Sequence, residues 1–350
     1  MEERERGPAA MAGREKWAHR QVLEEVAPDW DIDPASVRLV RDGMNHVFEA
    51  TSSGTPVIVR VTDDAHRCRD LVLGELQWTV FLEGRGCRVT HALPSLRGSY
   101  VESRRAGGRL YHVACFRKEQ GQVVRPGDPA WWNEDLFRAW GRAIGRLHRE
   151  SAAFRFQPPG RRQHWYEEPE LAGLDSPDPC FPADVVAAMR SHLERLRALP
   201  QGEACGLVHN DVKDDNFFVV GPGELLLFDF DESCLCWLLN DLVVPLYFYY
   251  AYPLCQLPGA GPAEAGRFLA GLLEGYRQEH PLTREQLERT QDLLKLREIL
   301  IYVIIRPHLD YWQRSAGARS LTHSFPETVA LMEERMRRGA PVIELDFSSF

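Results

Sequence analysis

Val208-His209-Asn210-Asp211-Val212-Lys213-Asp214-Asp215-Asn216 is the stretch that determines the architecture of this chain. A second stretch, Leu225-Leu226-Leu227-Phe228-Asp229-Phe230-Asp231, follows a turn-forming segment. Each stretch joins an apolar run, which predicts a buried strand, to polar residues at its end. Asp211, Asn216 and Asp229 therefore follow two neighbouring strands, and we predict that they form one polar site.

The spacing H-x-D-x-x-x-x-N followed by D-F-x is what phosphoryl transfer on a kinase-type scaffold requires. A carboxylate at Asp211 can orient a hydroxyl nucleophile and accept its proton. The amide oxygen of Asn216 and the carboxylate of Asp229 suit Mg²⁺, which prefers hard oxygen ligands. We therefore predict Asp211 as catalytic, Asn216 and Asp229 as metal ligands, and Mg²⁺ with ATP or GTP as cofactors. The alternative is a solvated polar hairpin with Gly221-Pro222-Gly223 as its turn.

The composition indicates a globular protein and excludes several functional classes. Hydrophobic residues make up 44% of the 350 positions, enough for a sizeable core. The net charge of −9 argues against nucleic acid as the main ligand and is compatible with a cationic or neutral substrate. The eight cysteines form no C-x-x-C pair, which predicts free thiols in a reducing compartment.

The chain carries no signal of export or membrane insertion. Its charged start, Met1-Glu2-Glu3-Arg4-Glu5-Arg6, lacks the apolar stretch of a signal peptide. The longest apolar runs, 242–254 and 299–305, are too short to span a bilayer. We expect a cytoplasmic protein, monomeric or homodimeric, with no membrane and no nucleic-acid partner.

The order of the elements predicts two lobes of different kind. Residues 1–15 are expected to be a disordered tail, and residues 16–116 a small lobe of short strands with one helix from Leu71 to Glu83. Residues 117–130 leave the last strand as a polar hinge. Residues 131–350 are mainly helical and form the larger lobe. The fold class is therefore α+β and bilobed.

The larger lobe opens with a predicted helix from Asn133 to Arg149, in which Gly141 and Gly145 permit close packing. A Pro/Gly/Arg-rich stretch, 154–182, is long for a structureless loop, and such loops are usually functional or mobile. Further helices are predicted over the ranges 183–199, 238–250, 263–279, 283–308 and 325–338.

The chain resembles the aminoglycoside phosphotransferase and choline-kinase-like superfamily, which shares the protein kinase fold. The resemblance is carried by Gly141-x-x-x-Gly145-x-Leu147-His148, by His209-Asn210-Asp211 through Asn216, and by Phe228-Asp229-Phe230-Asp231 with Asn240-Asp241-Leu242 downstream. The N-terminal part, with Glu75-Leu76-x-Trp78, is most similar to the homoserine-kinase and stress-response-kinase branch. The resemblance implies a protein-kinase-like fold, a catalytic role for Asp211, a buried structural carboxylate at Asp241, and last helices that build the acceptor pocket.

The nucleotide-binding residues are also implied by this resemblance. Arg60 stands where the family has its phosphate-binding lysine, and an arginine can still pair with Glu75 and reach phosphates. The alternative is a strand-end arginine in solvent. The segment Gly43-Met44-Asn45-His46 takes the place of the phosphate-covering loop, although it is not G-x-G-x-x-G. We expect nucleotide contacts from five residues: Asn45, Arg60, Glu75, Phe116 and Lys118.

Two further departures concern residues 208–216, which we call the catalytic stretch. Asn210 replaces the glycine common in small-molecule kinases. Lys213 is a feature shared with Ser/Thr protein kinases, in which it meets the transferring phosphoryl group, and we predict that it is catalytic. The alternative for Lys213 is a solvated charge.

The acceptor is expected to approach Asp211 from the larger lobe. We predict that its pocket is walled by Asp231, Glu232 and Trp237 together with the helices at 247–252 and 297–311, and that 154–182 closes over it. The acidic side chains would suit a cationic acceptor. The alternative for the aromatic residues between 237 and 252 is core packing.

The sequence thus predicts a Mg²⁺–nucleotide-dependent kinase that phosphorylates a hydroxyl of a small molecule. The acceptor is predicted to be an antibiotic of the aminoglycoside, macrolide or nucleoside type, which would make the protein a resistance enzyme. The alternatives are a protein Ser/Thr kinase of the stress-response type, a metabolic kinase of an amino acid, sugar or amino alcohol, and a non-catalytic pseudokinase.

Overall fold

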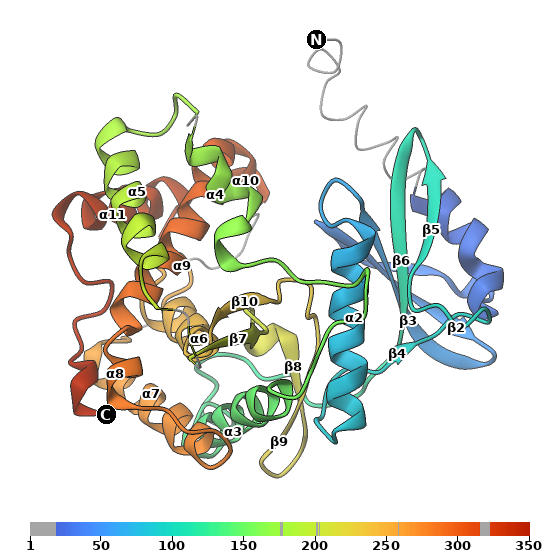
Figure 1. Cartoon of the computed structure of the whole chain (residues 1–350), viewed down its shortest axis with the longest axis horizontal. Coiled ribbons are helices and arrows are strands. Elements are labelled where there is room, and N and C mark those ends of the chain that lie inside the picture. The colour runs from blue at the N-terminus through green and yellow to red at the C-terminus, as the bar shows by residue number, and fades with distance from the viewer. Residues whose placement is uncertain (1–18, 176–177, 201, 203, 258, 316–322) are drawn as a thin grey trace. The chain divides into compact units, whose positions relative to one another are not determined.

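A computed structural model describes residues 19–175, 178–200, 202, 204–257, 259–315 and 323–350. The predicted disordered tail, 1–15, lies outside the described residues. The chain divides into two compact units (Figure 1): Met1–Gln120 with Phe154–Arg162, and Gly121–Ala153 with Gln163–Phe350. The first boundary falls inside the predicted hinge of 117–130, whereas the stretch 154–162, predicted in the larger lobe, belongs to the first unit.

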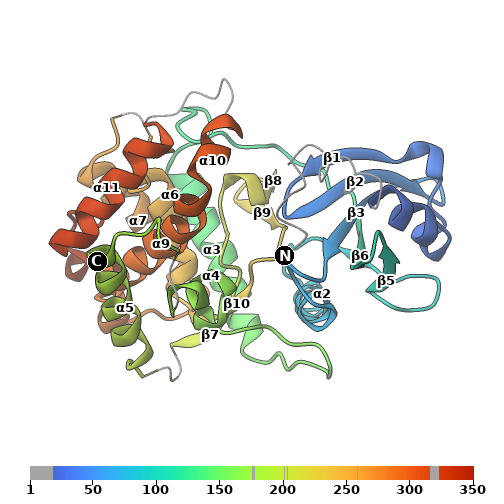
Figure 2. The same ribbon diagram turned by 90° about the horizontal axis from the view of Figure 1, so that it is seen from above.

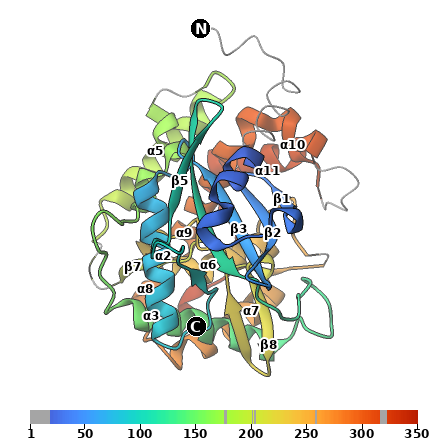
Figure 3. The same ribbon diagram turned by 90° about the vertical axis from the view of Figure 1, so that its right-hand side faces the viewer.

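The first unit is built on an antiparallel sheet of six strands in the order β1-β2-β3-β6-β4, with β5 also paired to β6. Its strands are β1 (Arg38–Asp42), β2 (Asn45–Ser52), β3 (Thr55–Asp63), β4 (Ala92–Leu93), β5 (Glu102–Ala106) and β6 (Arg109–Arg117). Helix α2 (Arg69–Gly84) lies against the sheet (Figure 3).

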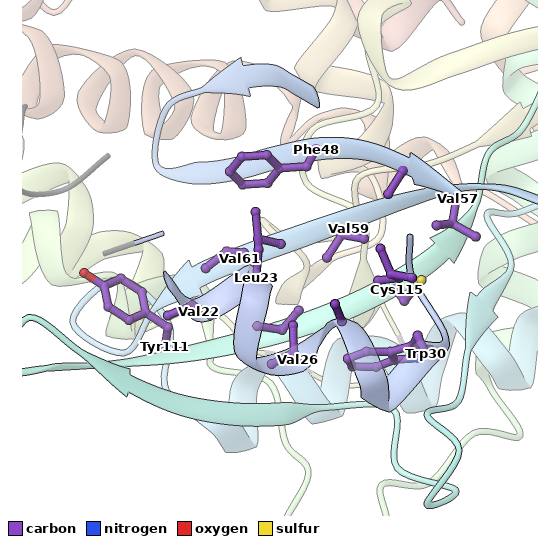
Figure 4. Packing of buried hydrophobic residues seen from close by; sticks show 14 of the residues in the cluster. Val22, Leu23, Val26, Trp30, Phe48, Val57, Val59, Val61, Tyr111 and Cys115 are labelled. Atoms are coloured by element: carbon purple, nitrogen blue, oxygen red, sulfur yellow. The ribbon is translucent and has the colours of Figure 1, made fainter. Parts of the chain in front are cut away.

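The two faces of strand β3 pack against different layers because side chains alternate along a strand. Val57, Val59 and Val61 point to one face, where they meet residues of the helical segment 19–26 and the 3₁₀ helix η2 (Ala27–Trp30) in one apolar cluster (Figure 4). Ile58 packs on the other face, in the cluster that includes α2. Arg60 has the same parity as Ile58, so its side chain is directed toward α2.

The stretch 154–162 runs along α2 and is fixed there by hydrogen bonds. The amide of Arg161 donates to the carbonyl of Asp70 at 3.0 Å, and the side-chain amide of Gln77 exchanges two hydrogen bonds with the backbone of Gln157. Gly74 permits this approach, since a Cβ there would lie 2.1 Å from the Arg161 carbonyl oxygen. The expectation of one long loop over 154–182 is therefore wrong for this part.

The remainder of that predicted loop also contains regular structure. It forms the 3₁₀ helix η4 (Trp165–Glu167), the short helix α4 (Pro169–Ala172) and the 3₁₀ helix η5 (Gly173–Asp175). Residues 176–177 lie outside the described part.

The second unit is mainly helical, with two small antiparallel strand pairs. The strands are β7 (Cys205–Val208), paired with β10 (Cys234–Trp237), and β8 (Phe217–Gly221), paired with β9 (Glu224–Leu227). The helices are α3 (Glu134–Ser151), α5 (Ala183–Arg197), α6 (Asn240–Tyr250), α7 (Pro262–Arg277), α8 (Arg284–Leu287), α9 (Thr290–Ile305), α10 (Leu309–Ser315) and α11 (Phe325–Arg338). The single helix predicted over 283–308 is divided into α8, α9 and the 3₁₀ turn η7 (Arg306–His308).

Helices α3 and α7 touch backbone to backbone along their length (Figure 1). A Cβ at Gly141 would lie 1.8 Å from the carbonyl oxygen of Leu272, and a Cβ at Gly275 would lie 1.9 Å from that of Arg138. A Cβ at Gly145 would lie 2.7 Å from the carbonyl oxygen of Tyr276. The predicted role of Gly141 and Gly145 in close packing is confirmed.

Helices α5, α9 and α11 lie together on another side of the second unit (Figure 2). α9 also contacts α6, so it connects this group to the helix that follows the catalytic stretch. In the described part of the chain, none of the helices has the length and apolarity needed to cross a membrane. The predicted α+β fold class, with a sheet-based first unit and a mainly helical second unit, is confirmed.

Candidate active site

The catalytic stretch leaves strand β7 at His209 and returns through the 3₁₀ turn η6 (Asp214–Asn216) into β8. The side-chain NH₂ of Asn216 donates to the carbonyl oxygen of Asp211 at 2.8 Å and to its carboxylate Oδ2 at 2.7 Å. This orientation commits the NH₂ group to Asp211. The amide oxygen, which is the atom that could bind a cation, therefore points away from that carboxylate.

Asp229 is brought to the same place by the pairing of β8 with β9. Leu227 pairs with Phe217, and the amide of Phe228 donates to the carbonyl of Asn216 at 3.0 Å. Asp229 is the next residue and has a left-handed backbone with φ 61°. Asn216 thus directly precedes β8, and Asp229 lies two residues after β9, the strand paired with it. Their oxygen donors fit a hard divalent cation.

Helix α6 anchors the start of the catalytic stretch through one carboxylate. Asp241 is fully buried; its Oδ2 accepts from the amide of His209 at 2.8 Å and its Oδ1 from the amide of Asn210 at 2.7 Å. His148 of α3 contacts Oδ2 through Nε2 at 3.0 Å. Burial alone would raise the pKa of Asp241, but the hydrogen bond and charge of His148 hold it below its usual value. Asp241 thus occupies the buried structural position that the resemblance implied.

Lys213 lies inside the site rather than in solvent. Its Nζ is 3.0 Å from Oδ2 of Asp211 and 2.8 Å from Oδ1 of Asp215, and it lies 5.7 Å from the centroid of the Phe248 ring. Burial alone would lower the pKa of Lys213, but the two carboxylates raise it above its usual value. The ammonium of Lys213 is therefore held beside the carboxylate of Asp211.

The predicted acceptor residues have different environments. Asp231 is buried and Glu232 is half-buried, and they lie two and three residues after Asp229. Trp237 is only 2% exposed, and its ring packs against Trp165 with centroids 5.6 Å apart. It lies on β10, opposite Cys205 of β7. The expectation that Trp237 lines the acceptor pocket is therefore corrected, because an indole enclosed in this way cannot stack on a ligand.

The aromatic residues of α6 and the turn after it are likewise core. Tyr247, Tyr249, Tyr250 and Tyr252 are all buried, whereas Phe248 is half-buried beneath Lys213. The core alternative therefore applies to the four tyrosines, and Phe248 is the member that accompanies the catalytic stretch.

In the first unit, Arg60 and Glu75 form a buried bidentate ion pair. Nη1 donates to Oε1 at 2.9 Å and Nη2 to Oε2 at 2.6 Å, and both side chains are nearly inaccessible. The guanidinium lies 5.4 Å from the centroid of the Phe116 ring. The solvent alternative for Arg60 is wrong, because the parity of β3 turns the side chain toward α2.

Asn45 and Lys118 stand at the two ends of strand β3. Asn45 pairs with Thr62 and accepts a hydrogen bond from its hydroxyl at 2.7 Å, while the amide of Lys118 donates to the carbonyl of Pro56. With a strand rise of about 3.3 Å per residue, these two positions are roughly 20 Å apart. The structure therefore groups Arg60, Glu75 and Phe116 but places Asn45 and Lys118 on either side of them. The ammonium of Lys118 contacts Glu49 at 2.7 Å.

Two contacts to the catalytic stretch were missed by sequence reasoning. Arg297 of α9 donates to Asn210, and the hydroxyl of Tyr249 of α6 contacts the carboxylate of Asp214 while accepting from the Asp214 amide at 2.9 Å. Both partners come from helices whose apolar patterns predict core positions. The available signal in the sequence was Arg297, because an arginine within the apolar pattern of a buried helix indicates a specific polar partner.

One family model and two known proteins resemble this chain over most of its length. Residues 36–286 match the model of the phosphotransferase enzyme family. The amicoumacin kinase of Bacillus subtilis (strain 168) is 30% identical over 332 residues, covering 94% of this chain and 95% of the relative. An uncharacterized protein of Deinococcus radiodurans is 29% identical over 272 residues, covering 75% of this chain and 74% of the relative.

Two solved structures also resemble this chain over most of its length. The amicoumacin kinase hAmiN, solved with AMP-PNP, Ca²⁺ and Ami, has a TM-score of 0.83 and 28% identity and covers 98% of this chain and 99% of its own. A microcompartment-associated aminopropanol kinase, at 19% identity and a TM-score of 0.69, covers 91% of this chain and 98% of its own, and supports the fold alone. The matched region contains the catalytic stretch and the Arg60–Glu75 pair. The chain therefore belongs to the phosphotransferase enzyme family.

Proposed function

We propose that this protein transfers the terminal phosphoryl group of ATP or GTP to a hydroxyl of a small-molecule antibiotic, and that the amicoumacin class is the first acceptor to test. The observation that carries this proposal is the relation to an amicoumacin kinase over 94% of the chain at 30% identity. A second amicoumacin kinase, solved with AMP-PNP and Ca²⁺, resembles the chain over nearly its whole length.

The geometry of the second unit supports a phosphoryl transfer of this type. Asp211 would orient the acceptor hydroxyl and take its proton, because Asn216 and Lys213 both hold its Oδ2 in place. The amide oxygen of Asn216 and the carboxylate of Asp229 would hold Mg²⁺. When bound, such an ion neutralises charge on the nucleotide phosphates. Lys213 would place a positive charge beside the transferring group.

The first unit would contribute the nucleotide contacts. We assign Arg60 to the phosphates, with Glu75 fixing its orientation through a bidentate pair, since a guanidinium can contact phosphates. Phe116, Lys118 and Asn45 are assigned to the nucleotide from the family pattern. Asp231 and Glu232 are assigned to the acceptor, where two carboxyl groups would favour a cationic molecule.

The test is a phosphorylation assay with labelled ATP and, separately, labelled GTP. The acceptors are amicoumacin, an aminoglycoside, a macrolide, a nucleoside antibiotic, an amino alcohol, homoserine and a generic protein. We expect label on amicoumacin, dependent on a divalent cation. We expect its loss in Asp211→Asn and its retention in Asp346→Asn, a carboxylate that caps the 3₁₀ turn η8 (Phe347–Ser349). Label on the protein substrate or the amino alcohol alone would overturn the proposal.

A further inference from the structure

Asn210, immediately before Asp211, has every polar group in a hydrogen bond. Its amide donates to Asp241, its side-chain NH₂ donates to the carbonyl of Glu232 at 3.0 Å, and its side-chain oxygen accepts from Asn240 at 2.8 Å. Its backbone is left-handed, with φ 66°. Asparagine tolerates this region better than most residues, but the conformation still has to be held by its surroundings.

Arg297 supplies the remaining contacts of Asn210. Its Nη2 donates to the carbonyl oxygen of Asn210 at 3.0 Å and also to the side-chain oxygen of Asn210. The carbonyl belongs to the peptide bond that joins Asn210 to Asp211. Holding that peptide fixes the direction in which the chain enters Asp211.

The environment of Arg297 is unusual for a buried cation. The residue is 8% exposed, and within the described ranges no carboxylate forms an ion pair with it. Its Nε has no hydrogen-bond partner among those residues. A buried charge without an opposite charge is expensive, so fold stability gives little reason for an arginine at this place.

We propose that Arg297 is a positioning residue that sets Asp211 through Asn210. The same Asn210 side chain reaches the carbonyl of Glu232, in the segment that follows Asp229. Arg297 and Asn210 together therefore fix the residue that would accept the proton relative to the segment that would bind the metal. This inference rests on the proposed role of Asp211. It also gives a physical reason for asparagine at 210, since glycine has no side chain to make three of these contacts.

The kinetic test uses the full-length protein with Arg297→Met, which keeps the volume and removes the charge, and Arg297→Lys, which keeps a donor. Misplacing a catalytic group by about 1 Å costs on the order of 100-fold in rate. We expect Arg297→Met to lower kcat by about 10- to 100-fold, with the nucleotide KM changed less than about threefold and the midpoint of thermal unfolding not lowered. Arg297→Lys should recover part of kcat. A lowered unfolding midpoint with unchanged kcat would show a structural role only and overturn the inference.

A double-mutant cycle tests whether Arg297 acts through Asn210. Asn210→Gly should lower kcat, and the Asn210→Gly, Arg297→Met double variant should be no slower than the slower single variant. Additive losses would overturn the inference. The control is Arg190→Met on α5, an exposed arginine whose hydrogen bonds go to backbone carbonyls of Leu174 and Asp175 and which should leave kcat unchanged.

Hydrogen exchange separates this inference from the proposed function. Amides of the segment 208–216 should exchange faster in Arg297→Met and Asn210→Gly than in the wild type, and equally fast in the double variant. This readout needs no acceptor, so it decides the positioning role even if amicoumacin is not phosphorylated. Unchanged exchange in Arg297→Met would contradict the inference.

Discussion

Arg60 in the first unit and Arg297 in the second are both buried arginines, but their partners differ in charge. Arg60 gives both terminal nitrogens to the carboxylate of Glu75, whereas Arg297 gives one to two uncharged oxygens of Asn210. A buried ion pair makes each partner depend strongly on the other. Uncharged partners do not create this dependence. Arg60 is therefore held by an opposite charge, whereas Arg297 is held by uncharged oxygens.

The largest expected effect follows from the charged pair. Glu75→Ala removes the buried carboxylate that accepts from both terminal nitrogens of Arg60, so it should lower the free energy of unfolding by about 3–5 kcal/mol. Denaturant unfolding of the wild type and the variant measures this difference. The matched control is the double variant Arg60→Met, Glu75→Leu, which removes both charges and should restore most of the stability. A loss below about 1 kcal/mol in Glu75→Ala would show that Arg60 does not depend strongly on Glu75 and would contradict the comparison.

Acid should affect the two units over different pH ranges. Burial, and to a lesser extent neighbouring His46, lowers the pKa of His19 to about 4. Below its ordinary value of 6.5 the unfolded chain therefore takes up a proton that the folded first unit does not bind. Stability should fall between pH 6.5 and pH 4, by up to about 3 kcal/mol. The pKa of Asp241 is instead lowered from 3.8, so its contribution is lost only at still lower pH.

Unfolding followed from pH 7 to pH 4 tests this difference. The decline should be smaller in His19→Gln, which cannot be protonated in this range. The matched control is His66→Gln, at a half-buried histidine, which should leave the decline in place if His19 causes it. An identical decline in the wild type and His19→Gln would assign the acid sensitivity to other groups.

A smaller effect is expected from a single tyrosine hydroxyl in the second unit. Tyr249→Phe removes a hydrogen bond to the half-buried carboxylate of Asp214 and the acceptor of the Asp214 amide. Hydrogen bonds to charged groups contribute about 1.5–3 kcal/mol, so the free energy of unfolding should fall by that amount. Tyr250→Phe is the control, since its hydroxyl contacts Trp132 rather than the catalytic stretch. Equal losses in the two variants would remove the special role of Tyr249.

The smallest effect on stability is expected at the exposed ion pair of the first unit. Lys118 and Glu49 are each more than one third exposed, so solvent screens their attraction. Lys118→Ala should leave the unfolding transition unchanged and weaken nucleotide binding, as measured by titration calorimetry. A clear loss of stability with unchanged nucleotide affinity would make Lys118 a structural residue.

Much of the fold could be predicted because it depends on the local spacing of apolar residues and glycines. The alternation in β3 places Val57 and Val59 on one face and Arg60 on the other, and the glycine spacing in α3 matches its contact with α7. The catalytic stretch was recognisable because Asp211, Asn216 and Asp229 follow apolar strands at fixed offsets.

The remaining features depend on contacts between distant segments. The bond between Arg297 and Asn210 joins positions 87 residues apart, and no periodicity indicates which arginine of a helix meets which loop. Trp237 illustrates the same limit, since a tryptophan near a catalytic stretch suits both a ligand and a core. Whether Trp237 is buried or accessible depends on how β10 pairs with β7 and on the packing of Trp165, which are tertiary contacts. The stretch 154–162 returns to α2 because Gly74 admits its backbone, which is a tertiary contact.

The central claim is that Asp211 of the second unit handles the proton of a small-molecule hydroxyl, and Asp211→Asn tests it most directly. Its kcat with amicoumacin and saturating Mg²⁺–nucleotide should fall by roughly 10²–10⁴, while nucleotide affinity measured by calorimetry stays within a few-fold of the wild type. That result would separate chemistry from binding. Near-normal kcat in Asp211→Asn would contradict the account.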